Sequence, residues 1–93
     1  MTDPPPDSPM DDFLSLSREY AEALEALGTI EKQAESIVAL GGREQLGSYV
    51  EQFLAMARRA GDHARECELH EIAGWFDDLT ARASRIRTAL LAD

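Results

Sequence analysis

The sequence predicts an all-α fold, an antiparallel three-helix bundle or coiled coil, and three observations support this prediction. The chain after residue 9 is rich in Ala, Leu, Glu and Arg, which favour helices, and it has no run of β-branched residues. The four prolines stand at positions 4, 5, 6 and 9, so none interrupts the rest of the chain. Apolar residues recur at spacings of three and four, the pattern of helices that pack through one face.

The first segment combines a tail and a helix start. Residues 1–8 predict a disordered, proline-rich acidic tail, and residues 9–93 predict one helical domain. Ser8 is the expected N-cap, Pro9 suits the first helical position, and the two aspartates that follow Met10 suit the positive end of the helix dipole. The first helix is expected at about 9–40. Its apolar seam consists of Phe13, Leu16, Tyr20, Ala23, Leu27, Ile30, Ala34 and Ile37.

The second helix is expected to be short, at about 43–60. Gly41 and Gly42 precede it, and glycine readily adopts the left-handed conformation that closes a helix. Residues 60–62, Ala-Gly-Asp, offer a second closing glycine followed by an N-cap. A broad apolar stripe lies between these signals, which indicates a helix packed against two neighbours.

The third helix is expected at about 62–91, with an apolar seam in unbroken register. The seam consists of Leu69, Ile72, Phe76, Leu79, Ala83, Ile86 and Leu90. Gly74 is the one point at which this helix could break to form a fourth. The continuous register favours one helix over two.

The predicted helices have unequal lengths: two long and one short. At 1.5 Å per residue, the first and third would span about 42–45 Å and the second about 25 Å. Two apolar ends would then remain uncovered, which predicts a homodimer or another oligomer that completes the bundle, or a partner helix. The alternative is that the helices bend or break at Gly74 and cover themselves. The expected contact residues are Phe13, Leu16, Tyr20, Leu79, Ile86 and Leu90.

The net charge narrows the class of partner. Eighteen acidic residues against nine basic ones give a formal charge of −9, which disfavours nucleic acid and anionic membrane surfaces. Residues 1–42 carry nine of the acids and only two bases, so the first helix suits a basic protein surface.

The location is expected to be cytoplasmic, in a bacterium. No apolar stretch is long enough to span a membrane, and the N-terminus lacks the basic and apolar segments of a secretory signal. A single cysteine cannot form an intrachain disulfide, which agrees with a reducing compartment. Eight arginines against one lysine are typical of GC-rich bacterial genomes.

The segment HARECELHEIAGW, residues 63–75, contains both histidines and the only cysteine. On one continuous helix His63, Cys67 and His70 would share a solvent-facing stripe, with spacings at which pairs of side chains can chelate a metal ion. The chain has no further histidine or cysteine to complete such a site, so this alternative would form mostly between two chains, and neither a metal nor a cofactor is predicted. A nucleophilic Cys/His pair is the other chemical alternative, although no pocket or third residue can be assigned to it.

Within this segment, ELHEIAG resembles the phospho-acceptor motif of two-component signalling, found in histidine phosphotransfer domains and sensor-kinase dimerisation helices. The resemblance implies that His70 accepts the phosphoryl group, that Glu71 is the neighbouring acid and that Gly74 leaves room for a response regulator. The lysine that phosphotransfer domains usually place before this glycine is Ala73 here.

The sequence therefore predicts a small, acidic, non-enzymatic helical module for protein–protein interaction, acting as an adaptor, regulator or chaperone-like protein. The first alternative is a phosphotransfer protein that uses His70. The second is an acidic inhibitor or immunity-type protein that blocks a basic site.

Overall fold

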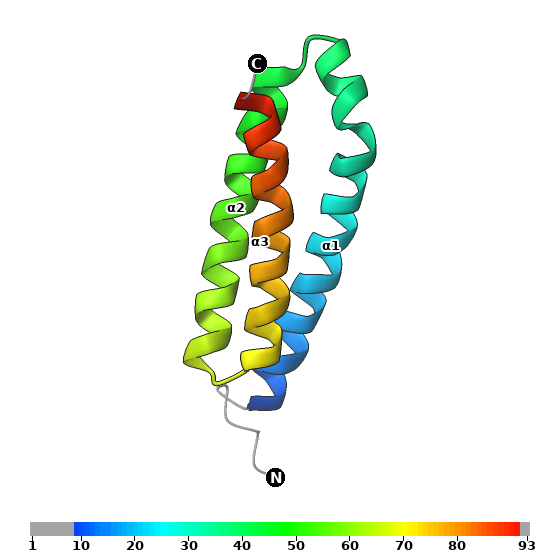
Figure 1. The fold of residues 1–93 in the computed structure, drawn as a ribbon. Helices are drawn as coiled ribbons and strands as arrows, with labels where there is room; N and C mark the ends of the chain where they lie inside the picture. Colours follow the sequence, from blue (N-terminus) through cyan, green and yellow to red (C-terminus); the bar gives the residue numbers. More distant parts are fainter. Residues whose placement is uncertain (1–8, 92–93) are drawn as a thin grey trace.

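The structure, a computed structural model, describes residues 9–91 and has three helices in that range: α1 (Pro9–Ala39), α2 (Arg43–Glu66) and α3 (His70–Leu91). The helices alternate in direction and form one bundle (Figure 1). The prediction of an all-α helical bundle is confirmed. The predicted tail, with Ser8, lies outside the described residues.

The boundary between the second and third helices lies further along the chain than predicted. The expected helices at 43–60 and 62–91 are wrong at this boundary, because α2 runs on to Glu66 and α3 begins only at His70. Consequently α2 has 24 residues and α3 has 22, so neither matches the predicted lengths. α3 continues through Gly74 without a break, as the apolar register predicted.

Small residues of α2 explain this difference. Ala57, Ala60, Gly61 and Ala64 are all buried, and their spacing continues the apolar face of α2 toward its end. A methyl group placed on Gly61 would lie 3.5 Å from Cβ of Phe76, an ordinary van der Waals contact. Gly61 is therefore part of the close contact between α2 and α3, and it does not end the helix.

The end of α1 has the hydrogen bonds of a glycine-closed helix. Gly41 has a φ of 88°, and its N–H donates to the carbonyl of Val38 at 3.0 Å. The N–H of Gly42 donates to the carbonyl of Ile37 at 2.8 Å. Together these two bonds form a Schellman motif, which satisfies carbonyls that the helix leaves open.

The end of α2 has the same pair of bonds without a glycine. Glu68 takes the left-handed position with a φ of 61°, and its N–H donates to the carbonyl of Arg65 at 3.0 Å. The N–H of Leu69 donates to the carbonyl of Ala64 at 2.8 Å. A glutamate rarely adopts this conformation, so the residue type gives no signal that α2 ends here.

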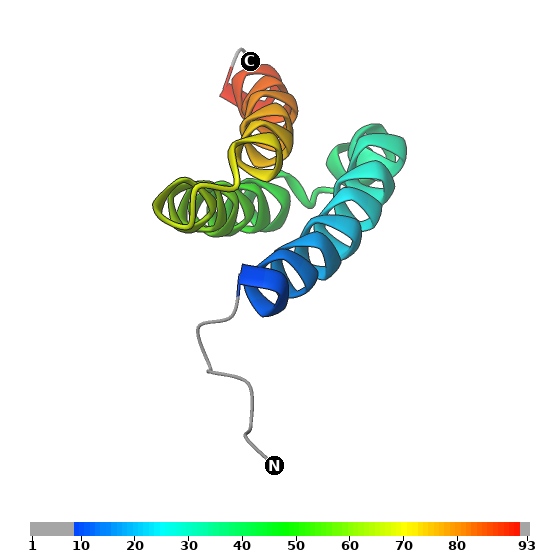
Figure 2. The ribbon, with the colours of Figure 1, turned by 90° about the horizontal axis from the view of Figure 1, so that it is seen from below.

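The core lies where the three helices meet, and α2 and α3 contribute most of it. The largest fully buried side chains are Leu27 from α1, Val50 and Leu54 from α2, and Ile72, Phe76 and Leu79 from α3. α1 is buried through its N-terminal part, but after Ile30 none of its residues is fully buried. Seen along the bundle, α1 leans away from the α2–α3 pair (Figure 2).

The burial of the predicted contact residues corrects the argument from helix lengths. Leu16 and Leu79 are 2% and 0% exposed, so both belong to the core and cannot form an uncovered end. Tyr20, Ile86 and Leu90 are half-buried against that core. The longer α2 covers surfaces that a helix ending at residue 60 would have left bare. No helix within residues 9–91 has both the length and the hydropathy of a membrane span.

Candidate functional site

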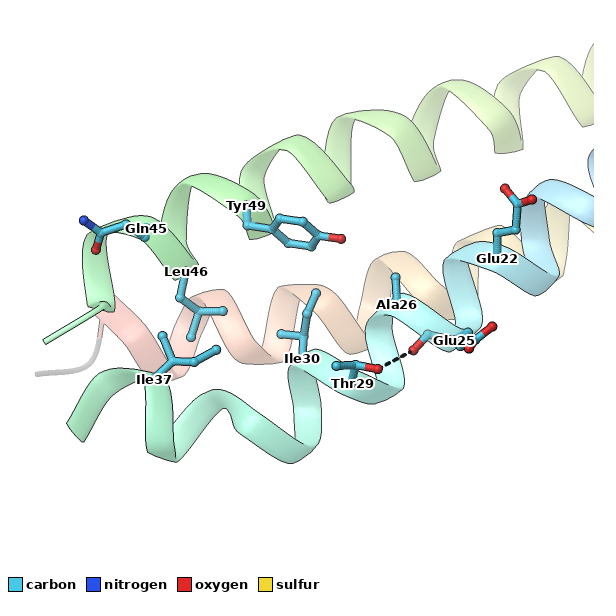
Figure 3. A pocket seen from close by; sticks show the side chains of 9 residues that line it. All are labelled: Glu22, Glu25, Ala26, Thr29, Ile30, Ile37, Gln45, Leu46 and Tyr49. Carbon is cyan, nitrogen blue, oxygen red and sulfur yellow. Dashed lines mark hydrogen bonds between the residues drawn. The ribbon is translucent and has the colours of Figure 1, made fainter. Parts of the chain in front are cut away.

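A groove of about 570 Å³ opens between α1 and α2 (Figure 3). It lies beside the part of α1 in which full burial ends. Its lining residues are Glu22, Glu25, Ala26, Thr29, Ile30 and Ile37 from α1, and Gln45, Leu46 and Tyr49 from α2. The groove is therefore formed by two helices that approach each other without closing their shared face.

The two parts of this groove differ in chemistry. Ile30, Ile37 and Leu46 give an apolar surface, and the ring of Tyr49, 48% exposed, projects beside them (Figure 3). Carboxylates from α1, those of Glu22 and Glu25, lie toward the other end. An apolar surface next to carboxylates is suited to a ligand that is both apolar and cationic.

A second groove, of about 610 Å³, lies between α1 and α3. Ile86 and Leu90, two of the predicted contact residues, line it together with Val38. Its rim includes Arg43, whose Nη1 donates a hydrogen bond to the carbonyl of Leu90 at 2.7 Å. Apolar surface is therefore accessible on both sides of the C-terminal part of α1.

The histidine segment does not form one helical stripe. His63 lies in the last turn of α2, Cys67 lies in the turn after it, and His70 is the first residue of α3. The predicted set of His63, Cys67 and His70 assumed a single helix through residues 63–70, and that assumption is wrong.

Asp12 joins His63 and Cys67 instead. The thiol of Cys67 donates to Oδ2 of Asp12 at 3.6 Å and lies 3.8 Å from Nε2 of His63. The same nitrogen lies 3.9 Å from Oδ1 of Asp12. In the described part of the chain these three residues form a group whose donor atoms could all reach one metal ion, and His70 is not in it.

The surroundings of Cys67 disfavour the alternative of a nucleophilic thiol. Burial raises the pKa of the Cys67 thiol, and its hydrogen bond to Asp12 and the charge of that carboxylate raise it further. A nucleophilic cysteine requires the opposite shift, because only the thiolate attacks. The geometry favours a protonated thiol at neutral pH, which a metal ion could convert to a bound thiolate.

The residues of the phosphotransfer resemblance lie together at the start of α3. His70, Glu71 and Gly74 are all exposed, and a methyl group on Gly74 would meet nothing within 4 Å. His70 lines a depression of about 300 Å³ together with Phe13. Phosphotransfer through His70 stays a prediction, and His70 is exposed at the start of α3.

Two features of these sites had no clear signal in the sequence. Asp12 is 55 positions from Cys67, and its place near a helix start already had an explanation in the helix dipole. Tyr49 has the spacing of the apolar residues of α2, yet it is 48% exposed on the groove between α1 and α2. Both depend on how the helices pack, which residue spacing does not determine.

Comparison with known proteins assigns no family to this arrangement. No protein-family model, no curated protein and no solved structure matches the chain.

Proposed function

We propose that this protein is a non-enzymatic interaction module whose groove between α1 and α2 binds an amphipathic helix of a basic protein partner. The observation that carries this proposal is the groove lined by Ile30, Ile37 and Leu46 and bounded by the carboxylates of Glu22 and Glu25. Ile30 and Leu46 are buried, so the accessible apolar surface comes from the half-buried Ile37 and the exposed Tyr49. Helices dock in such grooves by inserting apolar side chains spaced three and four residues apart. Cationic residues at one end of the docked helix would meet the two carboxylates.

Charge favours a basic partner over a second copy of this chain. The whole protein has a net charge of −9, so two copies repel each other at long range. Within α1 the sequence places seven acids and two bases, which makes this wall of the groove the more acidic one. The predicted homodimer loses part of its support as well, because Leu16 and Leu79, two of the residues expected at uncovered helix ends, are buried in the core.

An inhibitor that blocks a basic site would use the same charge but a different surface. Such a protein would bind mainly through exposed carboxylates, whereas the proposed module binds through the apolar part of the groove. Cytoplasmic location remains part of the proposal and is supported by the single cysteine.

The proposal is tested with a designed amphipathic peptide that carries leucines at three- and four-residue spacing and arginines at one end. Its binding is measured by fluorescence anisotropy, and a peptide with glutamates in place of the arginines is the control. We expect the basic peptide to bind, and its affinity to fall with added salt because the steering charges are exposed. Equal binding of the two peptides would contradict the proposed partner chemistry.

Variants locate the binding surface. The double change Glu22→Lys and Glu25→Lys should weaken binding at least about tenfold, and Tyr49→Ala should weaken it as well. The double change Glu66→Lys and Glu71→Lys is the matched charge control, because both residues are exposed and lie outside the groove. Unchanged binding in both groove variants would contradict the proposal. So would a dimer mass in light scattering that Tyr49→Ala converts to a monomer, because a second copy would then occupy the groove.

A further inference from the structure

We propose that Asp12, His63 and Cys67 form a binding site for one divalent metal ion of the zinc class. The proposed ion would join the first turns of α1 to the end of α2. This site lies away from the α1–α2 groove and shares no residue with it. The inference therefore does not depend on the proposed interaction partner.

The distances between donor atoms of the three residues are close to those around a tetrahedral ion. Zinc bonds of about 2.0–2.3 Å place neighbouring donors about 3.3–3.7 Å apart around a tetrahedron. The observed separations are 3.6 Å from Asp12 Oδ2 to Cys67 Sγ, 3.8 Å from Cys67 Sγ to His63 Nε2 and 3.9 Å from His63 Nε2 to Asp12 Oδ1. These separations use both carboxylate oxygens of Asp12, and one donor atom from each of the three residues lies within 4.8 Å of the other two. Rotation of the half-buried Asp12 and exposed His63 side chains would then bring one oxygen, one nitrogen and the sulfur onto one ion.

The chemical types of the donors select the class of metal. A thiolate, an imidazole and a carboxylate are the three side-chain ligands that zinc uses, and the thiolate disfavours magnesium and calcium, which prefer oxygen. The metal would replace the thiol proton of Cys67, which is released to solvent, so that sulfur binds as the thiolate. The fourth position of the tetrahedron would be taken by water, because the side chains of His63 and Asp12 are 53% and 30% exposed.

The backbone holds two of the ligands in place before any metal binds. Cys67 caps α2, and its N–H donates to the carbonyl of His63 at 3.0 Å, which fixes the two residues one turn apart. Asp12 belongs to a different helix, α1, so a shared ion would close a loop of more than fifty residues. A link between positions so distant in sequence restricts the unfolded chain and should stabilise the fold.

The experiment uses the full chain after treatment with a chelator, titrated with Co²⁺ as a spectroscopic probe and with Zn²⁺ in competition. We expect saturation at one ion per chain, a sulfur-to-cobalt charge-transfer band in the near ultraviolet and the strong visible bands of tetrahedral cobalt. Addition of Zn²⁺ should abolish these bands and raise the melting temperature.

Three ligand variants and two controls determine the outcome. Cys67→Ser should remove the charge-transfer band, and Asp12→Asn and His63→Ala should each weaken binding at least about tenfold. Asp11→Asn and His70→Ala are the matched controls, one acid and one histidine outside the group, and should leave the affinity unchanged. The inference is overturned if Cys67→Ser and wild type bind with equal affinity, or if half an ion per chain binds together with dimer formation.

Discussion

The α2–α3 pair and α1 contribute unequally to the bundle. α2 and α3 pack closely, because alanines and one glycine on the buried face of α2 leave little side chain between the helices and place Gly61 beside Cβ of Phe76. α1 is buried only as far as Ile30, and beyond that point its side chains are half-buried or exposed. One part of the molecule therefore has a closely packed core, and the other has grooves on both sides of α1.

Surface ion pairs join the helices, but they do not explain why α1 is packed less closely than α2 and α3. Arg82 of α3 binds Glu31 of α1 through Nε and Nη2, and Arg65 of α2 binds Asp77 of α3 through both carboxylate oxygens. Exposed pairs of this kind usually contribute less than about 1 kcal/mol each. The difference between the two regions must therefore lie in apolar packing, and substitutions that change packing test it best.

The largest expected effect comes from the α2–α3 pair. Phe76 is fully buried, so Phe76→Ala should lower the free energy of unfolding by about 3–5 kcal/mol, through lost burial and the cavity that remains. Ile37 is only half-buried beside the groove, and Ile37→Ala should cost about 1–2 kcal/mol. Urea denaturation followed by circular dichroism measures both. Equal losses would show that α1 is as firmly packed as the other two helices.

The sequence predicted the helices themselves better than the point at which the second one ends. Apolar spacing is set by contacts along each helix, so the three helices and the continuity of α3 through Gly74 could be predicted. The end of α2 could not be predicted, because the sequence around a glycine does not show whether that glycine lies inside a helix or ends it. Gly61 has a packing role, whereas the closing position is occupied by Glu68.

The second test of the α2–α3 contact compares two glycines inside helices, one packed against a neighbour and one facing open space. Leucine at Gly61 must fit between α2 and Phe76, and Gly61→Leu should destabilise the fold by about 1–3 kcal/mol. Gly74 faces open space, so Gly74→Leu should stabilise it by about 0.5–1 kcal/mol through helix propensity. Thermal denaturation compares the pair. A stabilising Gly61→Leu would contradict the close contact of α2 with α3.

Substitutions at the C-terminal ends of α1 and α2 are expected to change the free energy of unfolding by less. Glu68 adopts the left-handed conformation that costs a side-chain-bearing residue roughly 1–2 kcal/mol, and glycine avoids this cost but loses more entropy on folding. Glu68→Gly should therefore stabilise the protein by about 0.5–1 kcal/mol. Gly41→Ala, at the equivalent position after α1, should destabilise it by about 1 kcal/mol. If both changes destabilise equally, Glu68 is held by contacts other than the shared turn geometry.

The candidate sites were less predictable than the helices, for a related reason. The sequence correctly marked His63 and Cys67 as residues close enough to act together, because they are one helical turn apart. It placed His70 beside them only because one helix was assumed to contain all three. The turn at residues 67–69 puts His70 on a new helix, and the packing of α1 brings Asp12 to the place that His70 was expected to occupy.

The smallest expected effect concerns His70 itself. His70 is exposed at the start of α3 and is not part of the Asp12 group, so His70→Ala should change the free energy of unfolding by no more than about 0.5 kcal/mol. His63→Ala in metal-free protein should have a similarly small effect, because that ring is exposed too. Incubation with a response regulator charged by acetyl phosphate tests the signalling alternative. We expect no acid-labile label on the chain, whereas a label that His70→Gln abolishes and His63→Gln retains would make His70 the phospho-acceptor and contradict a purely non-enzymatic module.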